Sequence, residues 1–185
     1  MLIQIKIIIF IIISAGIMYV SRRSLRNFRT HGFYRFFAWE AILILTLINI
    51  DYWIYDPHSV RQIISWCLLI ISIFLVIHGF KLLIGIGRPD VERVDPSLIH
   101  VEKTTKLVTV GAYKYIRHPL YGSVLFLDWG VFFKHFSWIG FYLAVLATFF
   151  LMMTAKMEEA ENISFFGNDY REYIKRTKMF IPFLV

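Results

Sequence analysis

The polar residues best suited to chemistry fall into two short segments of an otherwise apolar chain of 185 residues. Arg117 and His118 stand directly before Pro119, which suits the first turn of a helix because its missing amide hydrogen is not needed there. Both side chains therefore lie at the electropositive, donor-rich amino end of a helix, where anions bind. Glu158 and Glu159 follow near the end of a long helical stretch, where carboxylates oppose the helix dipole and need a cationic or hydrogen-bonding partner.

The arrangement of the apolar stretches brings these two segments together. The stretches 119–133 and 137–155 are separated by a very short connection and predict a helical hairpin. A helix that continues from residue 137 to residue 162 is about 39 Å long at about 1.5 Å per residue, so its end projects beyond the hydrocarbon. The two glutamates then return beside Arg117 and His118. We expect a ligand-binding cavity there, and the simpler alternative is a salt-bridged helix end at the headgroups.

Composition places the positioning elements in a membrane. Hydrophobic residues make up 58% of the chain and charged residues 18%, whereas soluble domains contain about 45–50% apolar residues. Further apolar stretches at 2–20, 36–55 and 63–84 are each near the length of about 20 residues that crosses a bilayer. Together with the hairpin they predict an all-α integral membrane bundle of about five transmembrane helices with a cytosolic C-terminal segment. The first stretch is longer than the apolar core of a signal peptide and lacks a basic region before it, so we expect it to be retained.

The chain also divides by function. Residues 1–84 are expected to form a transmembrane platform of three helices. Residues 85–185, which include the hairpin 119–155, are expected to bind the cofactor and carry the chemistry. The connection 85–111 is long enough to be either a functional lid or a connector, and the β-branched residues in 106–111 predict a strand-like end.

Basic residues indicate the orientation. They concentrate in 22–35, 88–117 and 156–178, which lie on one side of a membrane crossed five times. By the positive-inside rule the amino terminus is outside and the carboxyl terminus is cytoplasmic. Topology and attraction to anionic headgroups explain most of the net charge of +7, so membrane lipids are expected partners and nucleic acid is not. With the single Cys67 and scattered histidines, no metal site is expected.

Two further features bear on the site. Gly167 is a natural helix stop, and Asn168 or Asp169 can cap a short amphipathic helix on the membrane surface. Asp128 is a costly acid inside an apolar stretch. It lies on the same helical face as Tyr121, so it could point into the same cavity.

From about residue 100 onward, the chain resembles the isoprenylcysteine carboxyl methyltransferase family and its relatives, the integral-membrane phospholipid N-methyltransferases. The resemblance rests, in order, on Lys106-Leu107-Val108, Gly111, Tyr113, Arg117-His118-Pro119-Leu120-Tyr121-Gly122, Glu158-Glu159, Phe166-Gly167, Tyr170, Tyr173, Arg176 and Pro182. It implies an S-adenosylmethionine-dependent methyltransferase. The cofactor pocket would be cytosolic and roofed by the C-terminal segment, and a tunnel would lead to the lipid for a lipophilic acceptor.

The resemblance also implies roles for individual residues. The cofactor-binding residues carried over are Lys106, Leu107, Val108, Gly111, Tyr113, His118, Pro119, Tyr121, Glu158 and Glu159. Arg117 and Arg176 are the candidates to orient an anionic acceptor, because a guanidinium suits a carboxylate or phosphate. A carboxylate acceptor, which we favour, is already ionised at pH 7, whereas an amine must lose a proton, with Glu158 or Glu159 as the base.

Two other functions stay open on the sequence. Sterol-type membrane reductases that use NADPH share an arginine-histidine-proline-like motif and a related helical architecture. A non-catalytic lipid-binding protein could retain the same helical frame. The sequence does not predict an oligomeric state.

Overall fold

The computed structural model describes residues 1–88 and 104–182, and its regular elements there are all helical. The α-helices are α1 (Ile3–Ser21), α2 (His31–Asn49), α3 (Val60–Gly85), α4 (Pro119–Phe132), α5 (Trp138–Phe166) and α6 (Asn168–Arg176). Short 3₁₀ turns lie at Ser24–Arg26 (η1), Ile50–Tyr52 (η2) and Gly111–Lys114 (η4). The all-α prediction is confirmed.

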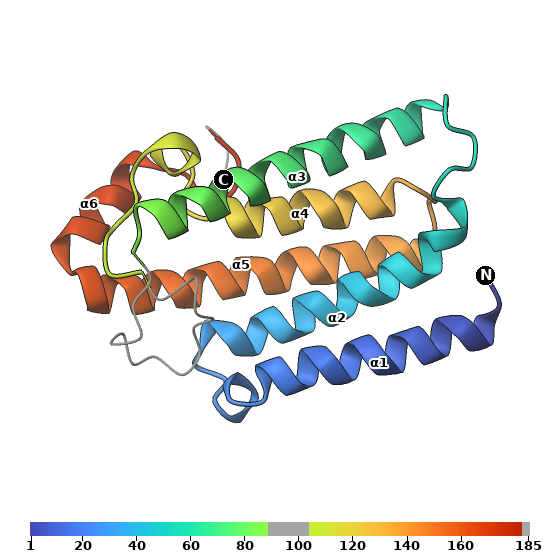
Figure 1. The fold of residues 1–185 in the computed structure, drawn as a ribbon, viewed down its shortest axis with the longest axis horizontal. Coiled ribbons are helices and arrows are strands. Elements are labelled where there is room, and N and C mark those ends of the chain that lie inside the picture. Colours follow the sequence, from blue (N-terminus) through green and yellow to red (C-terminus); the bar gives the residue numbers. More distant parts are fainter. Residues whose placement is uncertain (89–103, 183–185) are drawn as a thin grey trace.

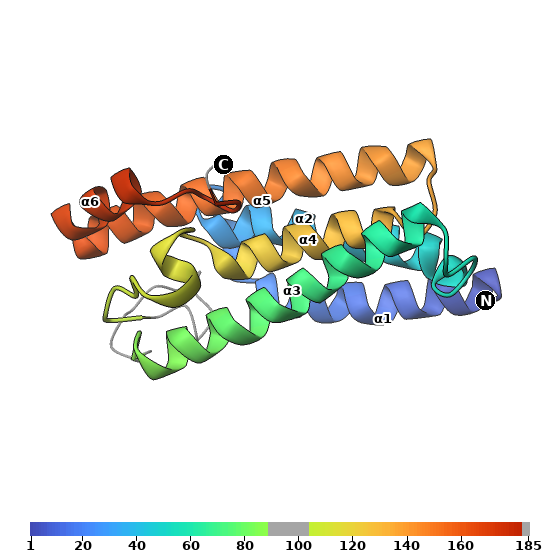
Figure 2. The ribbon, with the colours of Figure 1, turned by 90° about the horizontal axis from the view of Figure 1, so that it is seen from above.

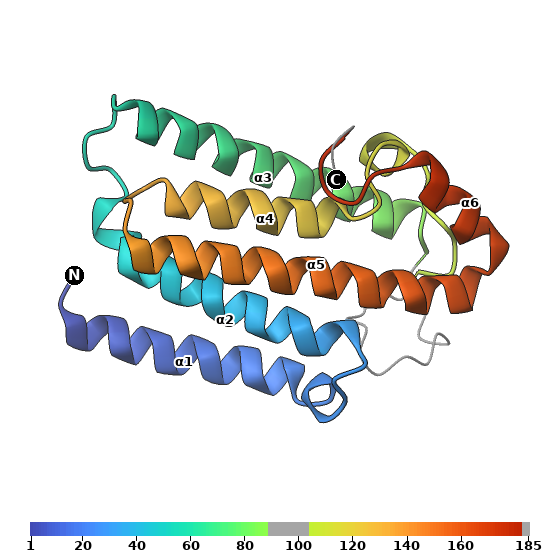
Figure 3. The same ribbon diagram turned by 180° about the vertical axis from the view of Figure 1, so that it is seen from behind.

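The five long helices run side by side and alternate in direction (Figure 1). α2 packs mainly against α5, and α3 packs along α4. Seen from above, α4 lies between α3 and α5 (Figure 2). α1 contacts α2 at the edge of the bundle, as the view from behind also shows (Figure 3). The predicted platform and catalytic region therefore share one core, and their functional division stays a prediction.

Local sequence signals explain where the helices begin and end. The hydroxyl oxygens of Ser59 and Ser137 accept backbone amides in the first turns of α3 and α5. Gly167 ends α5 at a positive φ of 63°, which favours glycine. α5 thus extends past the predicted 137–162. The predicted short helix α6 follows, but its N-cap is Gly167 and no side chain caps it, so the predicted cap at Asn168 or Asp169 is wrong. α2 begins at His31, earlier than the apolar stretch 36–55 indicated, because its first turns contain His31 and Arg35, polar residues that the helix nevertheless buries.

In the described part of the chain, α1, α2 with η2, α3 and α5 are long and apolar enough to cross a membrane. α4 has 14 residues, about 21 Å at about 1.5 Å per residue. It is shorter than a full span, as its apolar stretch already indicated, and it is covered by α3, α2 and α5. The protein is a multi-pass membrane protein in which α4 is the sheltered helix.

The bundle is fastened at the end away from α6. The side-chain amide of Asn49 donates to the carbonyls of Val131 (2.9 Å) and His135 (3.3 Å). Lys134 is fully buried, donates to Gln62 Oε1 at 3.0 Å, and lies 3.5 Å from the centre of the Trp66 ring. These contacts hold the α4–α5 connection against α2 and α3, and so fix the angle at which the hairpin leaves that end.

One predicted element is wrong. Residues 106–111 form an irregular segment that leads into η4, and no strand lies beside them among the described residues. Strand-forming residues need a neighbouring strand to pack and bond with, and here the Lys106 amide donates instead to the carbonyl of Gly87 at 3.1 Å. Of the connection 85–111, residues 89–103 lie outside the described residues, so the prediction of a lid or connector is untested.

Candidate functional site

The C-terminal half of α5, α6, the end of α3 and the start of α4 lie at one end of the bundle (Figure 1). Residues of these four helices line a polar cavity. Its volume is about 590 Å³ when the open solvent at its mouth is included, and the space open to the centres of water-sized molecules is about 70 Å³. The lining residues come from every one of these helices and from the segment before α4: Leu83, Thr104, Leu107, Val108, Tyr113, Arg117, His118, Leu120, Tyr121, Glu158, Asn162, Phe166, Tyr170 and Tyr173. The helical hairpin therefore brings together the two polar segments, as predicted.

His118 lies between the two glutamates of α5. Its Nε2 is 3.3 Å from Glu159 Oε1, and its Nδ1 is 4.0 Å from Glu158 Oε2. The imidazole is buried and stacks on the ring of Tyr121, with the ring centres 5.6 Å apart. This stack and the two carboxylates fix the plane of the imidazole at the base of the cavity.

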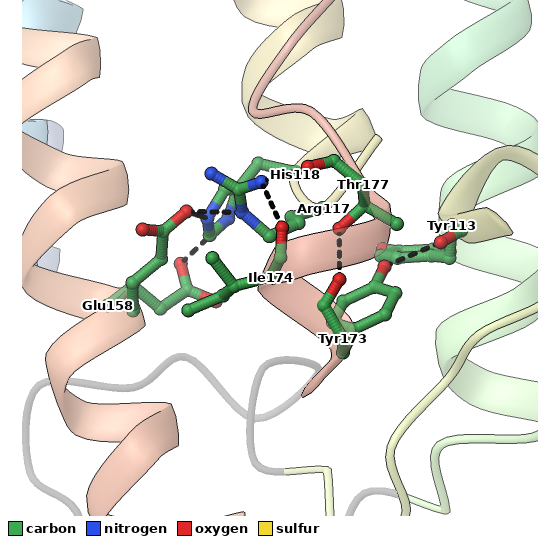
Figure 4. A network of polar contacts seen from close by, with 8 residues as sticks. Tyr113, Arg117, His118, Glu158, Tyr173, Ile174 and Thr177 are labelled. Atoms are coloured by element: carbon green, nitrogen blue, oxygen red, sulfur yellow. Dashed lines mark hydrogen bonds and ion pairs between the residues drawn. The ribbon is translucent and has the colours of Figure 1, made fainter. Parts of the chain in front are cut away.

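Arg117 neutralises Glu159 and also holds the C-terminal segment. Its Nε donates to Glu159 Oε1 at 2.6 Å, and one terminal nitrogen donates to the carbonyls of Ile174 and Thr177 (Figure 4). The guanidinium is mostly buried by these contacts. Glu158 is left as the carboxylate of the pair that lines the cavity, so the cavity carries a local negative charge.

The C-terminal segment folds back over the site beside the residues that precede α4. The backbone amide of Lys178 donates to the carbonyl of Tyr115 (2.9 Å), and the carbonyl of Lys178 accepts from the amide of Arg117 (2.7 Å). The His118 amide donates to Met179 O at 3.1 Å. We call residues 177–182 the C-terminal strap. These backbone contacts bring the strap beside Arg117 and His118, although the strap is far away from them in sequence.

Tyr170 and Tyr173 on α6 form the roof of the cavity. The Tyr173 hydroxyl donates to the carbonyl of Tyr113 at 2.6 Å, which joins α6 to η4 (Figure 4). Burial raises the pKa of Tyr173 well above its usual range, despite the opposing effect of Arg117. Burial, with the nearby charge of Glu158, likewise raises the pKa of Tyr170. Both phenols therefore stay neutral at physiological pH.

His78 on α3 contacts η4 and fixes its position. Its Nε2 accepts the amide of Ala112 at 3.3 Å, and its ring stacks on Phe74. Gly111 has a positive φ of 60°, and a Cβ there would lie 2.6 Å from His78 Nε2. Only glycine therefore fits at this turn, which aims Tyr113 into the cavity.

The predicted cofactor residues are only partly brought together. Leu107, Val108, Tyr113, His118, Tyr121 and Glu158 line the cavity. Glu159 lies directly behind them through its contacts with Arg117 and His118. Gly111 and Pro119 support the walls, and Pro119 packs against Gly79 of α3. Lys106 is exposed and does not line the cavity.

The two predicted acceptor-orienting arginines are also placed differently. Arg117 lines the cavity, but its guanidinium is engaged by Glu159 and two carbonyls. Arg176 is exposed and lines a separate open cleft with Lys114 and Glu172. Asp128 is fully buried in the bundle and does not line the cavity, and neither of its oxygens has a hydrogen-bond partner among the described residues.

Several lining residues were not among the predicted cofactor residues. Asn162 and Phe166 follow Glu158 at intervals of four residues on α5, so helical spacing could have found them. Tyr170 and Tyr173 belong to the tail pattern but had no assigned role. Leu83 has no signal in the sequence, because its place depends on how α3 packs.

The chemical groups of the cavity lining suit those of S-adenosylmethionine, the expected cofactor. The cofactor carries a positive sulfur, an adenine ring and ribose hydroxyls. The carboxylate of Glu158 suits a cation or hydroxyl groups. The rings of Tyr113, Tyr121 and Phe166 offer faces for a flat base and for a positive charge.

Fold and site together define a multi-pass helical membrane protein with a compact ligand cavity at one end of its bundle. A family model described as phospholipid methyltransferase matches residues 60–169. The chain belongs to this family, which confirms the resemblance noted from residues 106–182. The match runs from the start of α3 to the start of α6, and so includes α3, α4 and α5 but not the two tyrosines of α6 that line the cavity.

The curated relatives include three methanethiol S-methyltransferases. The chain is 29% identical to methanethiol S-methyltransferase 1 of Bradyrhizobium diazoefficiens over 119 residues, 64% of this chain and 39% of that protein. It is 29% identical to the enzyme of Pseudomonas deceptionensis over 125 residues, 65% of this chain and 43% of that protein. It is 28% identical to the enzyme of Crocosphaera subtropica over 145 residues, 74% of this chain and 53% of that protein.

The chain thus spans about half the length, or less, of these relatives. No solved structure matches the chain.

Proposed function

We propose that the protein is an S-adenosylmethionine-dependent methyltransferase that acts on a lipophilic acceptor in the membrane. The observation that carries the proposal is the cavity in which His118 and Glu158 meet at the polar end of a methyltransferase-family bundle. Membership of this family argues against the NADPH-dependent reductase. The ordered polar network argues against a non-catalytic lipid-binding protein, which has no need of it.

In this proposal each polar group of the cavity has a role in holding the donor. Glu158 and His118 bind its polar groups, while Tyr113, Tyr121 and Phe166 enclose its flat and positively charged parts. Tyr170 and Tyr173 close the roof and exclude water. When bound, S-adenosylmethionine supplies a methyl group on a positive sulfur, and the bond to the acceptor forms as the carbon–sulfur bond breaks and leaves its electron pair on sulfur.

The proposal also concerns the head group of the acceptor, which is the group that receives the methyl. Carboxylate O-methylation, favoured on the sequence, relied on Arg117 and Arg176, and both guanidiniums are directed elsewhere. The relatives named as methanethiol S-methyltransferases support a sulfur nucleophile. A thiol or an amine must lose its proton, and Glu158 or His118 is the base within the cavity that can accept it.

An apolar groove supports a lipophilic acceptor. It runs along α4 between α3 and α5 and has a volume of about 880 Å³ including its open side. It is lined by Leu68, Leu125, Phe126, Trp129, Phe133, Thr148, Met152, Phe180 and Ile181. Because the groove lies within membrane-crossing helices, an alkyl chain can enter it without passing through water.

The orientation belongs to the same proposal. Residues 22–35, the segment before α4, and the end of α5 with α6 all lie at the cavity end of the bundle (Figure 1). By the positive-inside rule, the basic residues of these segments support a cytoplasmic location for this end. The donor, a soluble molecule, then reaches the cavity from the cytoplasm.

The proposal is tested by methyl transfer from radiolabelled S-adenosylmethionine in detergent-purified protein. The acceptors tested are dodecanethiol, dodecanoate and dodecylamine, which share the same alkyl chain length and differ in their head group. We expect transfer to one head above the others, with the thiol first, and loss of at least about 100-fold in rate in Glu158→Ala. Absence of transfer to all three by protein that binds S-adenosylhomocysteine would contradict the acceptor class.

A further inference from the structure

The cavity and the apolar groove do not share a lining residue. They meet at one place, where Tyr121 of the cavity and Phe180 of the groove pack in the same buried cluster with Ala155. The Phe180 ring is 2% exposed, and its centre is 6.3 Å from that of His118. The Phe180 ring therefore stands between the groove and the imidazole at the base of the cavity.

Methyl transfer needs the acceptor atom in direct contact with the donor carbon, at about 3–3.5 Å before reaction. With the donor in the cavity and the acceptor chain in the groove, the head must pass the wall made by Tyr121 and Phe180. Tyr121 is held on α4 and by its stack on His118. Phe180 stands on the C-terminal strap, whose backbone attaches to residues 115–118 by a few hydrogen bonds.

We propose that Phe180 is the gate between the groove and the cavity and sets which acceptors reach the donor. This inference rests on the proposed function and commits the groove to the alkyl chain of the acceptor. The backbone of the strap stays fastened at Lys178 and Met179 while the Phe180 ring swings, because those bonds do not involve the ring. Closing the gate again excludes water from the reacting atoms.

The test compares short and long acceptors of the same head. The parent, Phe180→Ala and Phe180→Trp are assayed with methanethiol and dodecanethiol, with acetate and dodecanoate, and with methylamine and dodecylamine. Phe180→Ala should raise kcat/KM for the long acceptor relative to the short one by about tenfold, and Phe180→Trp should lower it. Affinity for S-adenosylhomocysteine should stay within about threefold of the parent in both variants.

Phe149→Ala is the matched control, because Phe149 is an exposed phenylalanine of α5 that lines neither the cavity nor the groove. It should leave the long-to-short ratio unchanged. An unchanged ratio in both Phe180 variants, or an equal change for both acceptor lengths, would overturn the gate.

The two proposals fail in different ways. A parent that binds S-adenosylhomocysteine but methylates none of the long acceptors overturns the gate and leaves the donor site standing. A folded parent that does not bind S-adenosylhomocysteine overturns the proposed function and the gate with it.

Discussion

At the scale of single residues, the charge of the cavity depends on which of its ionic groups are paired with one another. Glu159 is neutralised by Arg117 at 2.6 Å and shares His118 with Glu158, which lines the cavity. Replacing Arg117 by lysine would keep the charge and lose the fork that reaches both the carboxylate and the carbonyls. The negative character of the cavity is thus set by Glu158.

Tyr173→Phe tests the roof at this scale. The substitution leaves the Tyr113 carbonyl without its donor. We therefore expect the free energy of unfolding to fall by about 1–2 kcal/mol near pH 7. Burial raises the pKa of Tyr173 in the folded protein, so the parent loses this stabilisation as pH rises above the unfolded value of about 10. The difference in stability between the parent and the variant should therefore narrow above pH 10. Thermal unfolding midpoints from pH 7 to 11 measure it, and a constant or widening gap would contradict the buried neutral phenol.

The sequence predicted the identity of these charged residues but not their partners. Arg117, His118, Glu158 and Glu159 were found from residue type and helix ends. The engagement of Arg117 by carbonyls near residue 175 depends on where α6 packs, which no local pattern records.

At the scale of elements, two features fix the polar end of α5. Glu161 accepts from the amide (3.2 Å) and the Nδ1 (2.6 Å) of His31 at the start of α2. On another side, Glu159 is bound by Arg117. These contacts hold the projecting turns of α5 against α2 and against the segment before α4, so Glu158 faces the cavity in a defined direction.

Helix positions were largely predictable, because apolar length and caps such as Ser137 and Gly167 are local signals. The irregular segment 106–111 was mispredicted, because β-branched residues form a strand only beside another strand. The contact of the C-terminal strap with residues 115–118 could not be predicted, since it joins backbone groups about 60 residues apart.

Arg117→Lys tests the strap. We expect amide hydrogen exchange at Lys178 and His118, whose amides bond across the strap contact, to speed up by about tenfold. The reason is that hydrogen bonds from a charged donor, worth about 1.5–3 kcal/mol, are lost. Affinity for S-adenosylhomocysteine should fall together with this protection. Lys175→Ala removes an exposed ion pair with Glu172 on α6 and serves as the control. Equal exchange in the parent and in Arg117→Lys would show that the guanidinium does not hold the strap.

At the scale of the whole molecule, the polar cavity and the apolar groove lie at different positions along the bundle. The cavity, the strap and the basic segments lie at one end, and the amino terminus lies at the other with the connections 50–59 and 133–137 (Figure 1). The apolar groove lies between these ends on α4. A soluble donor and a membrane-borne acceptor can therefore approach the same atoms from different phases.

Single cysteines test the orientation of this arrangement. In a Cys67→Ser background, His58→Cys and Arg171→Cys place exposed thiols at opposite ends of the bundle. A membrane-impermeant maleimide added to intact cells should label residue 58 and not residue 171 until the membrane is opened. The reverse pattern would place the cavity outside and contradict a cytoplasmic donor site.

The most direct measurement is calorimetric binding of S-adenosylhomocysteine to detergent-purified protein. The parent is compared with His118→Ala and Glu158→Gln, with Lys175→Ala as the control and NADPH as a second ligand. We predict micromolar binding by the parent and the control, at least about tenfold weaker binding by both site variants at a temperature where each is folded, and no binding of NADPH. Unchanged affinity in the folded site variants, or binding of NADPH alone, would contradict a methyl-donor site built around His118 and Glu158.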